Sequence, residues 1–256
     1  MSHHVDLNAD LGESFGPWTM GADADLLDIV SSANIACGFH ASDPDVMART
    51  MRLAAERGVA IGAHPGFADL QGFGRRRISL PPESLKNLVR YQVAAAQGMA
   101  RAAGGQLAHV KLHGALSNMA AEDEGLARLL FAAALDIDPD LVVYVLSATP
   151  MEAAARSLGC RWAGEVFADR AYNDDATLVD RREPGAVLHD PTAAALRMVE
   201  MVQAGAISTA SGGTIPARID TICLHGDTPE AVAMAHAIRS GLEKAGITIG
   251  PASERA

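Results

Sequence analysis

Polar and apolar residues alternate along several short segments of this chain, and that alternation constrains the fold more than any other feature. Successive side chains of a β-strand point to opposite faces, so the segment 5–11 (VDLNADL) places Asp6, Asn8 and Asp10 on one face. The same rule groups polar or small residues on one face of the segments 34–40, 59–64, 107–113 and 220–225. Each of these strands is therefore predicted to have one apolar face and one face that carries functional groups.

Strand-like and helix-like segments alternate along the whole chain, which is typical of a parallel sheet built from βα units. The predicted strands lie near 4–10, 34–40, 59–64, 107–113, 141–147, 161–167 and 220–225. The predicted helices lie near 22–32, 44–57, 82–103, 122–135, 150–158, 191–204 and 229–245. Most of these helices begin at a proline, often preceded by Asp or Thr, as expected for a capped first turn.

The polar strand faces distinguish between the two common architectures for such a chain. An open doubly wound sheet has helices on both sides, so its strands are apolar on both faces. A closed barrel needs an apolar face only toward its outer helices. We therefore expect a single domain over residues 1–256, an α/β fold in the form of a distorted TIM-like barrel of about seven parallel strands. An eighth strand is expected, if anywhere, in 206–219.

Five of the predicted strands end in a titratable residue on the polar face. The catalytic residues of β/α barrel enzymes come from the carboxyl ends of strands and the loops that follow. Imidazole groups there can act as general acids and bases near neutral pH. Together with Lys111, the strand-end residues are predicted to be catalytic, and they are Asp10, His40, His64, His113 and His225.

A second group of polar residues is predicted to bind substrate. Its members lie near the same strand ends or in the long loops 65–80 and 168–190, and loops of that length in a compact domain are usually functional. The arginines in the group could pair with a substrate carboxylate. The group comprises Asn8, Glu13, Arg75, Glu165, Asp169, Arg170 and Asp227.

Lys111 is unusual because the chain uses arginine for almost all of its 21 basic residues. It lies in mid-strand on the polar face, where an ammonium group without a partner is costly to bury. We therefore expect a partner such as Asp6, Asn8 or Asp10. The choice of lysine indicates either a compact charge or a group with a lowered pKa. A purely structural ion pair inside the barrel is the alternative.

The sequence motifs neither require nor exclude a catalytic metal. Two or three histidines with a carboxylate suit zinc or a similar ion, but HEXXH is absent, and His109 and His113 would lie about 13 Å apart along a strand. The segment 12–16 (GESFG) matches the GxSxG nucleophile elbow, yet Pro17 and Trp18 follow where that motif needs a helix. Neither a P-loop nor a GxGxxG fingerprint is present.

Charge and hydropathy exclude two classes of partner. The chain has 31 acidic and 21 basic residues, a formal net charge of -10, whereas nucleic acid and anionic membrane surfaces both require a positive footprint. No apolar stretch approaches the ~18 residues of a membrane span, and the first residues lack the features of a signal peptide. The three cysteines are far apart, which fits buried thiols in a reducing compartment. We therefore expect a cytoplasmic protein.

Seven blocks of this sequence resemble the signature blocks of one bacterial family, the A subunits of 5-oxoprolinase, also called the lactam-utilisation family. They are VDLNADLGESFG, SANIACGFHASDP, GVAIGAHPGFADLQGFGRR, HVKLHGALSNMA, EVFADRAYNDDATLV, PGAVLHDP and DTICLHGDTP, and the resemblance spans residues 4 to 247. The family's usual HVKPHGALYN appears here as HVKLHGALSN, with Leu112 for proline and Ser117 for tyrosine. Lys111 and His113 are kept.

The resemblance implies a barrel of the glycoside hydrolase/deacetylase type and a part in the ATP-dependent opening of 5-oxoproline to L-glutamate. It also implies two further subunits, named B and C, a small lactam as substrate, and ATP, with Mg²⁺, as co-substrate. Two alternatives stay open. One is a metal-dependent hydrolase or deacetylase that acts alone on an N-acyl or carbohydrate substrate, and the other is a non-catalytic protein that binds the lactam for its partners.

Overall fold

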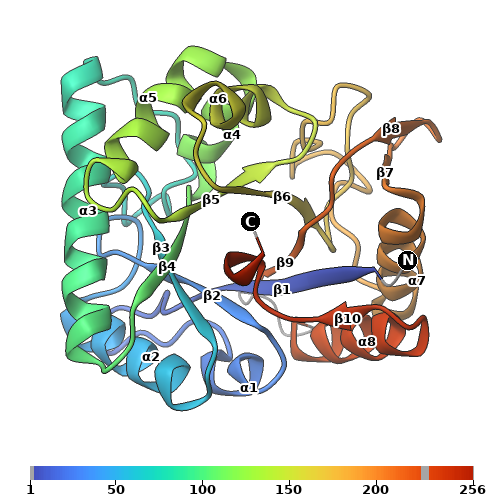
Figure 1. Cartoon of the computed structure of the whole chain (residues 1–256), viewed down its shortest axis with the longest axis horizontal. Coiled ribbons are helices and arrows are strands. Elements are labelled where there is room, and N and C mark those ends of the chain that lie inside the picture. Colours follow the sequence, from blue (N-terminus) through green and yellow to red (C-terminus); the bar gives the residue numbers. More distant parts are fainter. Residues whose placement is uncertain (1–2, 226–230, 256) are drawn as a thin grey trace.

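The computed structural model describes residues 3–225 and 231–255, and its centre is a closed barrel of seven parallel strands (Figure 1). The strands follow one another around the barrel in chain order, and the last pairs with the first and closes it. This confirms the predicted TIM-like architecture. The strands are β1 (His4–Leu11), β2 (Ser32–Ala36), β3 (Ala60–His64), β4 (Leu107–Lys111), β5 (Val142–Leu146), β6 (Trp162–Phe167) and β9 (Thr221–His225).

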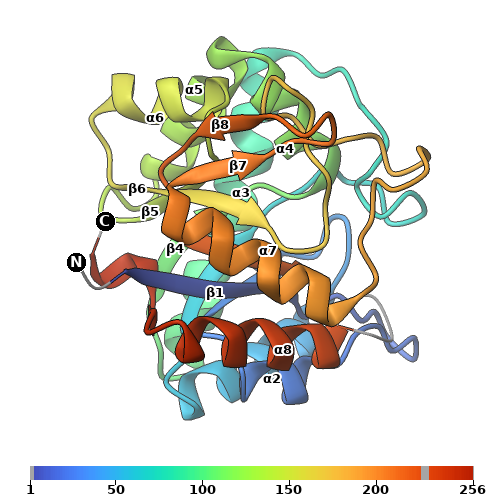
Figure 2. The ribbon, with the colours of Figure 1, turned by 90° about the vertical axis from the view of Figure 1, so that its right-hand side faces the viewer.

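Helices cover the outside of the barrel, and α7 and α8 lie side by side against it (Figure 2). Asp43 caps α2 by accepting the backbone N–H groups of Asp45 and Val46, with Pro44 as the first helical residue, as the sequence predicts. The helices are α1 (Asp23–Leu27), α2 (Pro44–Glu56), α3 (Pro82–Ala102), α4 (Gly114–Glu122), α5 (Glu124–Leu135), α6 (Pro150–Leu158), α7 (Pro191–Ala204), α8 (Ala231–Lys244) and the short 3-10 helix η1 (Ala252–Glu254).

The alternation along the strands separates the barrel's two environments as predicted. In β1, Val5, Leu7 and Ala9 are fully buried in the apolar layer between strands and helices. The intervening Asp6 and Asn8 are equally buried but hydrogen-bond with side chains from other strands. The barrel interior is therefore polar, whereas its outer face forms the hydrophobic core with the helices.

Three elements, β2, α1 and α4, differ clearly from the prediction. The strand expected over 34–40 is β2 and ends at Ala36, because Gly38 and Ser42 have φ values of 90° and 74° that a strand cannot adopt. The helix expected over 22–32 is only the five residues of α1. Helix α4 was not predicted, because it begins at Gly114 with neither a proline nor a side-chain cap to mark its first turn.

The segment 206–219 does not supply an eighth barrel strand. It forms an antiparallel ribbon of β7 (Ala206–Ser208) and β8 (Thr214–Pro216) outside the barrel. Gly212, with φ of 89°, lies in the tight turn between these three-residue strands. A further short strand, β10 (Thr248–Ile249), pairs in parallel with the first residues of β1.

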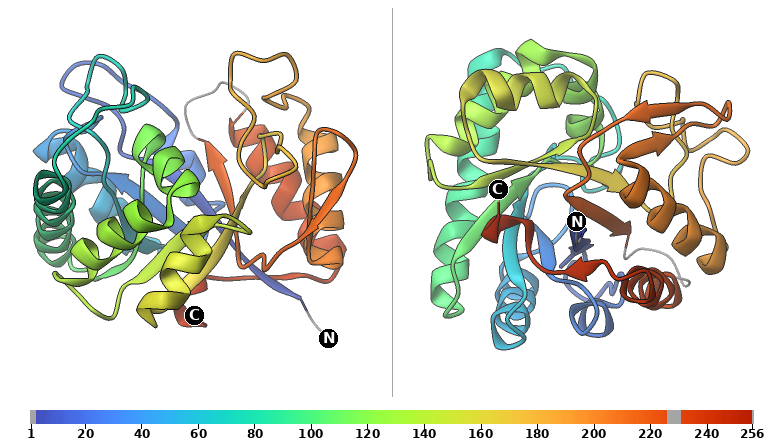
Figure 3. Two further views of the ribbon diagram at one scale, coloured as in Figure 1. Left: turned by 90° about the horizontal axis from the view of Figure 1, so that it is seen from above. Right: turned by 45° about the vertical axis from the view of Figure 1, so that its right-hand side comes forward.

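The two ends of the barrel carry different parts of the chain. Both termini lie at one end, and the long loops 65–80 and 168–190 rise from the other, where the strands end (Figure 3). The carboxyl ends of all seven strands therefore meet beneath those loops, and we call this end the mouth.

Within the described residues, none of the helices combines the length and apolar character needed to cross a membrane.

Candidate functional site

The polar side chains inside the barrel form layers, and the deepest surrounds Asp6. Its carboxylate accepts hydrogen bonds from the hydroxyl groups of Ser31, Ser32, Tyr144 and Thr221 at 2.5 to 2.9 Å. Burial raises the pKa of Asp6, and the four hydroxyl donors oppose that rise. Asp6 is thus fully used in a structural network, and the prediction that it could partner Lys111 is wrong.

Lys111, the last residue of β4, lies in the layer above. Its Nζ donates to Asp10 Oδ1 at 2.8 Å and lies 3.1 Å from Glu165 Oε1. Asn8 Oδ1 is 3.4 Å away, and the Sγ of Cys223 is 2.8 Å away. The predicted partnership with Asn8 and Asp10 is confirmed, and the structure adds Glu165 and Cys223 from two other strands.

The electrostatics of this layer keep Lys111 charged. Burial disfavours its ammonium form, but the Asp10 and Glu165 carboxylates outweigh burial and raise the pKa of Lys111 well above its ordinary value. Of the two possibilities that the choice of lysine indicates, a compact charge is supported and a lowered pKa is not. Burial raises the pKa of Glu165 and of the Cys223 thiol, while the Lys111 charge opposes both shifts.

Asn34 and His109 connect the layers and were not among the predicted site residues. Asn34 donates to the side-chain oxygens of both Asn8 and Asp10, and His109 Nε2 donates to the Asn34 oxygen at 2.8 Å. The His109 ring stacks on Tyr144, and burial lowers its pKa to about 3. The alternation places both residues on the polar face, but that position alone does not give them a role.

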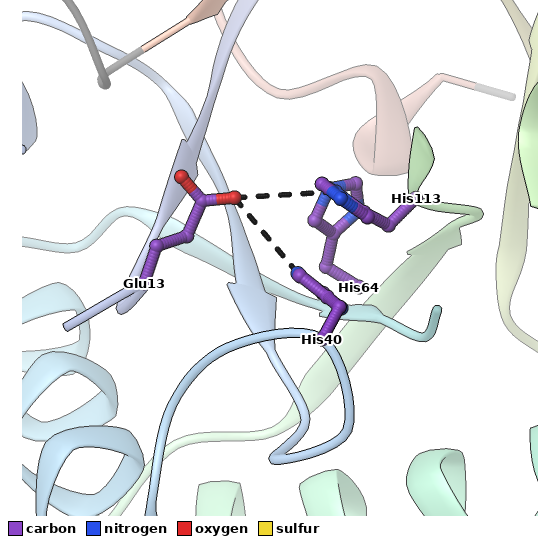
Figure 4. Close-up of side chains that lie close together, drawn as sticks. All are labelled: Glu13, His40, His64 and His113. Atoms are coloured by element: carbon purple, nitrogen blue, oxygen red, sulfur yellow. Dashed lines mark hydrogen bonds and ion pairs between the residues drawn. The ribbon is translucent and has the colours of Figure 1, made fainter. Parts of the chain in front are cut away.

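Four side chains meet at the mouth, each from a different strand end (Figure 4). Glu13 follows β1, His40 lies in the loop after β2, His64 is the last residue of β3, and His113 directly precedes α4. All four are buried, and one donor atom from each lies within 4.8 Å of the others. Three imidazoles and a carboxylate are a donor set that could hold a metal ion.

The hydrogen bonds of this cluster orient two of its rings. His64 Nδ1 donates to the backbone carbonyl of Lys111 at 2.8 Å, and His113 Nε2 donates to that of Phe73 at 2.8 Å. The other nitrogens of these two rings face one another at 3.0 Å. The His40 ring stacks on that of His113 with centroids 3.6 Å apart. Burial lowers the pKa of both His40 and His113 well below the ordinary value, which favours neutral rings.

The loop 65–80 brings one predicted arginine to the mouth. Arg76 forms an ion pair with Asp69 and ties the loop to itself. Arg75 is exposed, with its guanidinium 4.9 Å from the centroid of the Phe73 ring, and its charge contributes to lowering the pKa of His113. Arg75 is therefore placed where an anionic group entering the mouth would meet it.

Asp169 and Arg170 lie at the start of the loop 168–190 and are both buried. The Arg170 guanidinium donates to the backbone carbonyls of Val179 and Ala186, and burial lowers its pKa to about 10. The backbone carbonyl of Asp169 accepts from Leu188 N–H. These contacts hold the loop together, so the geometry favours Arg75 over Arg170 as the partner of a substrate carboxylate.

Three further residues that the sequence singled out, His225, Asp227 and Ser14, are not seen to take part in the site. His225 ends β9 with its backbone paired to Asp10, but its side chain and the whole of Asp227 lie outside the described residues. Ser14 of the GxSxG match accepts Met20 N–H within a tight turn closed by the bridge between Phe15 and Trp18. A nucleophile elbow is therefore not formed at Ser14.

Comparisons with known proteins agree with this barrel. The model of the LamB/YcsF family matches residues 5–256. A relative from Ruegeria pomeroyi, named as the A subunit of 5-oxoprolinase, is 63% identical over 245 residues, which are 96% of this chain and 97% of the relative. The crystal structure of a lactam utilization protein from Thermus thermophilus is 44% identical, with a TM-score of 0.90, and the match covers 96% of this chain and 99% of that one.

A more distant structure shows how widely the fold is shared. The family 4 carbohydrate esterase from Streptomyces lividans has a TM-score of 0.50 and 13% identity over 97% of this chain and 92% of its own. At this identity the likeness shows the fold alone. It agrees with the predicted barrel of the deacetylase type.

Proposed function

The chain belongs to the LamB/YcsF family, and from this premise we propose that it is the A subunit of a multi-subunit 5-oxoprolinase. In that role it would take part in opening 5-oxoproline to L-glutamate with hydrolysis of ATP. The proposal is carried by the 63% identity, over 96% of the chain, to a relative named for that subunit. The chemistry available at the mouth supports it.

Opening a lactam adds water across the amide bond: the carbonyl carbon gains a hydroxyl group, the C–N bond breaks, and the nitrogen gains a proton. Resonance protects that carbonyl from water, and ATP would activate it by transferring its γ-phosphoryl group to the carbonyl oxygen, with ADP as the leaving group. Water would then add to the carbon, the C–N bond would break to leave an acyl phosphate, and a second water would release inorganic phosphate and the carboxylate. The negative charge of the phosphorylated oxygen's phosphoryl group requires a fixed positive partner. Lys111 fits this need, because Asp10 and Glu165 keep it charged at the end of β4.

The histidines above Lys111 would orient the attacking water. Burial keeps the His40 and His113 rings neutral, so each has one nitrogen lone pair. That of His113, on Nδ1, faces His64, whereas His40 has no hydrogen-bond partner among the described residues and can accept a hydrogen bond from water. Glu13 Oε1 lies 3.9 Å from both rings and adds a carboxylate. Arg75, exposed beside them, would bind the carboxylate of the substrate.

The nucleotide and the partners complete the proposal. Because the chain has no P-loop or other recognisable nucleotide motif, ATP, with Mg²⁺, would bind an irregular site or a site shared with the B and C subunits. The relative's name, which describes one subunit of an enzyme, supports such a complex.

Replacing Lys111 tests the proposed chemistry. In a complex assembled from this chain and its two partner subunits, Lys111→Met should lower ATP-dependent glutamate release by about 100-fold or more, because the phosphorylated carbonyl oxygen loses its cation. Lys111→Arg keeps the charge in a bulkier group and should retain part of the activity. Lys86→Met, on helix α3 with its ammonium partly exposed, is the matched control and should change nothing.

Folding must be checked separately, because Lys111→Met leaves two buried carboxylates without their partner. Circular dichroism and complex formation provide that check. If folded, assembled Lys111→Met turns over at the rate of the unmodified complex, the assigned role of Lys111 is wrong.

The cluster of Glu13, His40, His64 and His113 favours a second candidate function, a metal-dependent hydrolase acting alone on an N-acyl or carbohydrate substrate. An arm of the same experiment with the isolated chain separates the candidates. Hydrolysis of such a substrate that stops with a chelator would support the second candidate. Binding of 5-oxoproline without turnover would support a non-catalytic, lactam-binding role.

A further inference from the structure

The positions of two protons in the mouth cluster follow from the backbone carbonyls around it. A carbonyl oxygen only accepts, so His64 Nδ1 and His113 Nε2 must both carry hydrogen. The remaining nitrogens, His64 Nε2 and His113 Nδ1, face one another at 3.0 Å, and Asp10 Oδ2 lies 3.4 Å from His64 Nε2. A cation bound by these two nitrogens would therefore lie beside the carboxylates of Asp10 and Glu13.

His40 supplies a second, independent observation. Its ring is 1% exposed, and neither of its nitrogens has a hydrogen-bond partner among the described residues. A buried polar group without a partner is destabilising, because it has lost its hydrogen bonds to water. Its Nε2 points toward Glu13, 3.9 Å from Oε1, in the direction of the same cluster (Figure 4). One ligand could therefore satisfy His40, His64 and His113 together.

The spacing of the donor atoms matches a divalent metal ion. With metal–ligand distances of about 2.0–2.1 Å, the ligand atoms of a tetrahedral zinc site lie roughly 3.3 Å apart. Here His64 Nε2 and His113 Nδ1 are 3.0 Å apart, and Glu13 Oε1 is 3.9 Å from both His40 Nε2 and His113 Nδ1. Closing a tetrahedral site would shorten the two Glu13 edges by about 0.6 Å and lengthen the His64–His113 edge by about 0.3 Å, with the other donor pairs, all within 4.8 Å, adjusting as well.

The surroundings of the donors resemble those of known metal sites. Histidines that bind metals usually donate their other ring N–H to a carbonyl or carboxylate, which fixes the ring. Both His64 and His113 do so, to the carbonyls of Lys111 and Phe73. Three imidazoles and one carboxylate suit zinc and similar borderline ions better than Mg²⁺, which prefers oxygen.

We propose that Glu13, His40, His64 and His113 form a binding site for one divalent transition-metal ion of the zinc class. The sequence alone left a metal open but did not single out this set, because its members are separated along the chain and follow no metal motif. An ion bound there would hold and polarise a water molecule at the mouth. The site concerns binding by this chain, so it stands or falls independently of the proposed oxoprolinase activity.

Direct metal binding by the isolated, tag-free protein tests the proposal. After removal of metals with a chelator, isothermal titration with Zn²⁺ should show one equivalent bound, and Co²⁺ should give the visible absorption of a low-coordinate nitrogen and oxygen site. His40→Gln and His113→Gln should each weaken Zn²⁺ binding by about 100-fold or more, beyond the 10–100-fold typical of outer-shell changes. His236→Gln, on the exposed face of α8, is the matched control and should bind like the unmodified protein.

Two results would overturn the site. The first is a correctly folded protein that takes up no Zn²⁺ or Co²⁺ in stoichiometric amount, in which case a shared proton rather than a metal lies between His64 and His113. The second is binding that His40→Gln and His113→Gln leave as strong as His236→Gln does. Glu13→Gln, which keeps the shape of the side chain, serves as a third ligand variant if either histidine variant fails to fold.

Discussion

At the scale of single residues, the buried polar groups of this barrel have two kinds of surroundings. Asp6, deep in the interior, receives four hydroxyl donors and has no need of a ligand. His40, at the mouth, is almost as buried but has no hydrogen-bond partner among the described residues. A satisfied polar group supports the fold, whereas an unsatisfied one indicates a place where a ligand would bind. This contrast separates the scaffold from the candidate site better than residue type does.

The network around Asp6 predicts a pH-dependent effect of Tyr144→Phe. Burial raises the folded-state pKa of Asp6 above 3.8, so the stability linked to its proton is complete below pH 3.8 and is lost as the pH rises through the folded-state pKa. Removing the Tyr144 hydroxyl raises that pKa further. The loss in free energy of unfolding, about 1–3 kcal/mol, should therefore be larger at pH 8 than at pH 5.

Urea denaturation at several pH values measures this difference. Tyr91→Phe is the matched control, because Tyr91 is exposed on α3 and should show no effect at any pH. A loss for Tyr144→Phe that is the same at pH 5 and pH 8 would contradict the assigned role of Asp6.

At the scale of elements, strands β3 and β4 meet with an irregular register. Their pairing shifts between Ile61 and Gly62, where the His109 ring of β4 lies against the Gly62 backbone. A side chain at position 62 would overlap that ring, which Asn34 and Tyr144 hold from other strands. The glycine is therefore required by the polar interior and not by a turn.

This packing predicts that Gly62→Ala destabilises the protein by about 1–3 kcal/mol, because the added methyl group has no space beside His109. Gly98→Ala is the matched control, since Gly98 is exposed on α3 with no atom near the added Cβ. The control should be neutral or stabilising by up to about 1 kcal/mol. Thermal unfolding of both variants checks the prediction, and equal melting temperatures would disprove it.

At the scale of the whole molecule, a polar barrel must be closed to water at the end opposite its mouth. The closure comes from the C-terminal segment: Ala252 of η1 packs with Val142, Tyr144 and Ala163 in a separate apolar cluster. The segment lies over the centre of the barrel near the label C in Figure 1. Arg161 fastens it by donating to the carbonyl of Ser253. This floor covers the layer around Asp6, whose side chain is fully buried.

The floor predicts that Ala252→Glu lowers the free energy of unfolding by about 2 kcal/mol or more, because a carboxylate would be forced among apolar side chains. Glu254→Gln, in the same short helix but exposed, should have no measurable effect. Chemical denaturation gives both values. If Ala252→Glu is as stable as its control, the segment does not seal the barrel.

The sequence by itself determined the barrel, its polar interior and the strand ends that bear the functional groups. The face of a strand follows from the alternation of its residues, and the start of a helix follows from its capping residue and proline. Both signals span only a few residues, so Asp10, His64 and Lys111 could be assigned to the interior without a structure. The same local rules could not place His40 in a loop, because the strand before it ends early at Ala36.

The tertiary structure alone decided which of these groups meet. Lys111 pairs with Glu165, and Glu13 faces His40 and His113, through the register and closure of strands far apart in the chain. No local period encodes that register. The raised pKa of Lys111 likewise depends on carboxylates brought to it across the barrel, which is why the sequence alone left both a compact charge and a lowered pKa open.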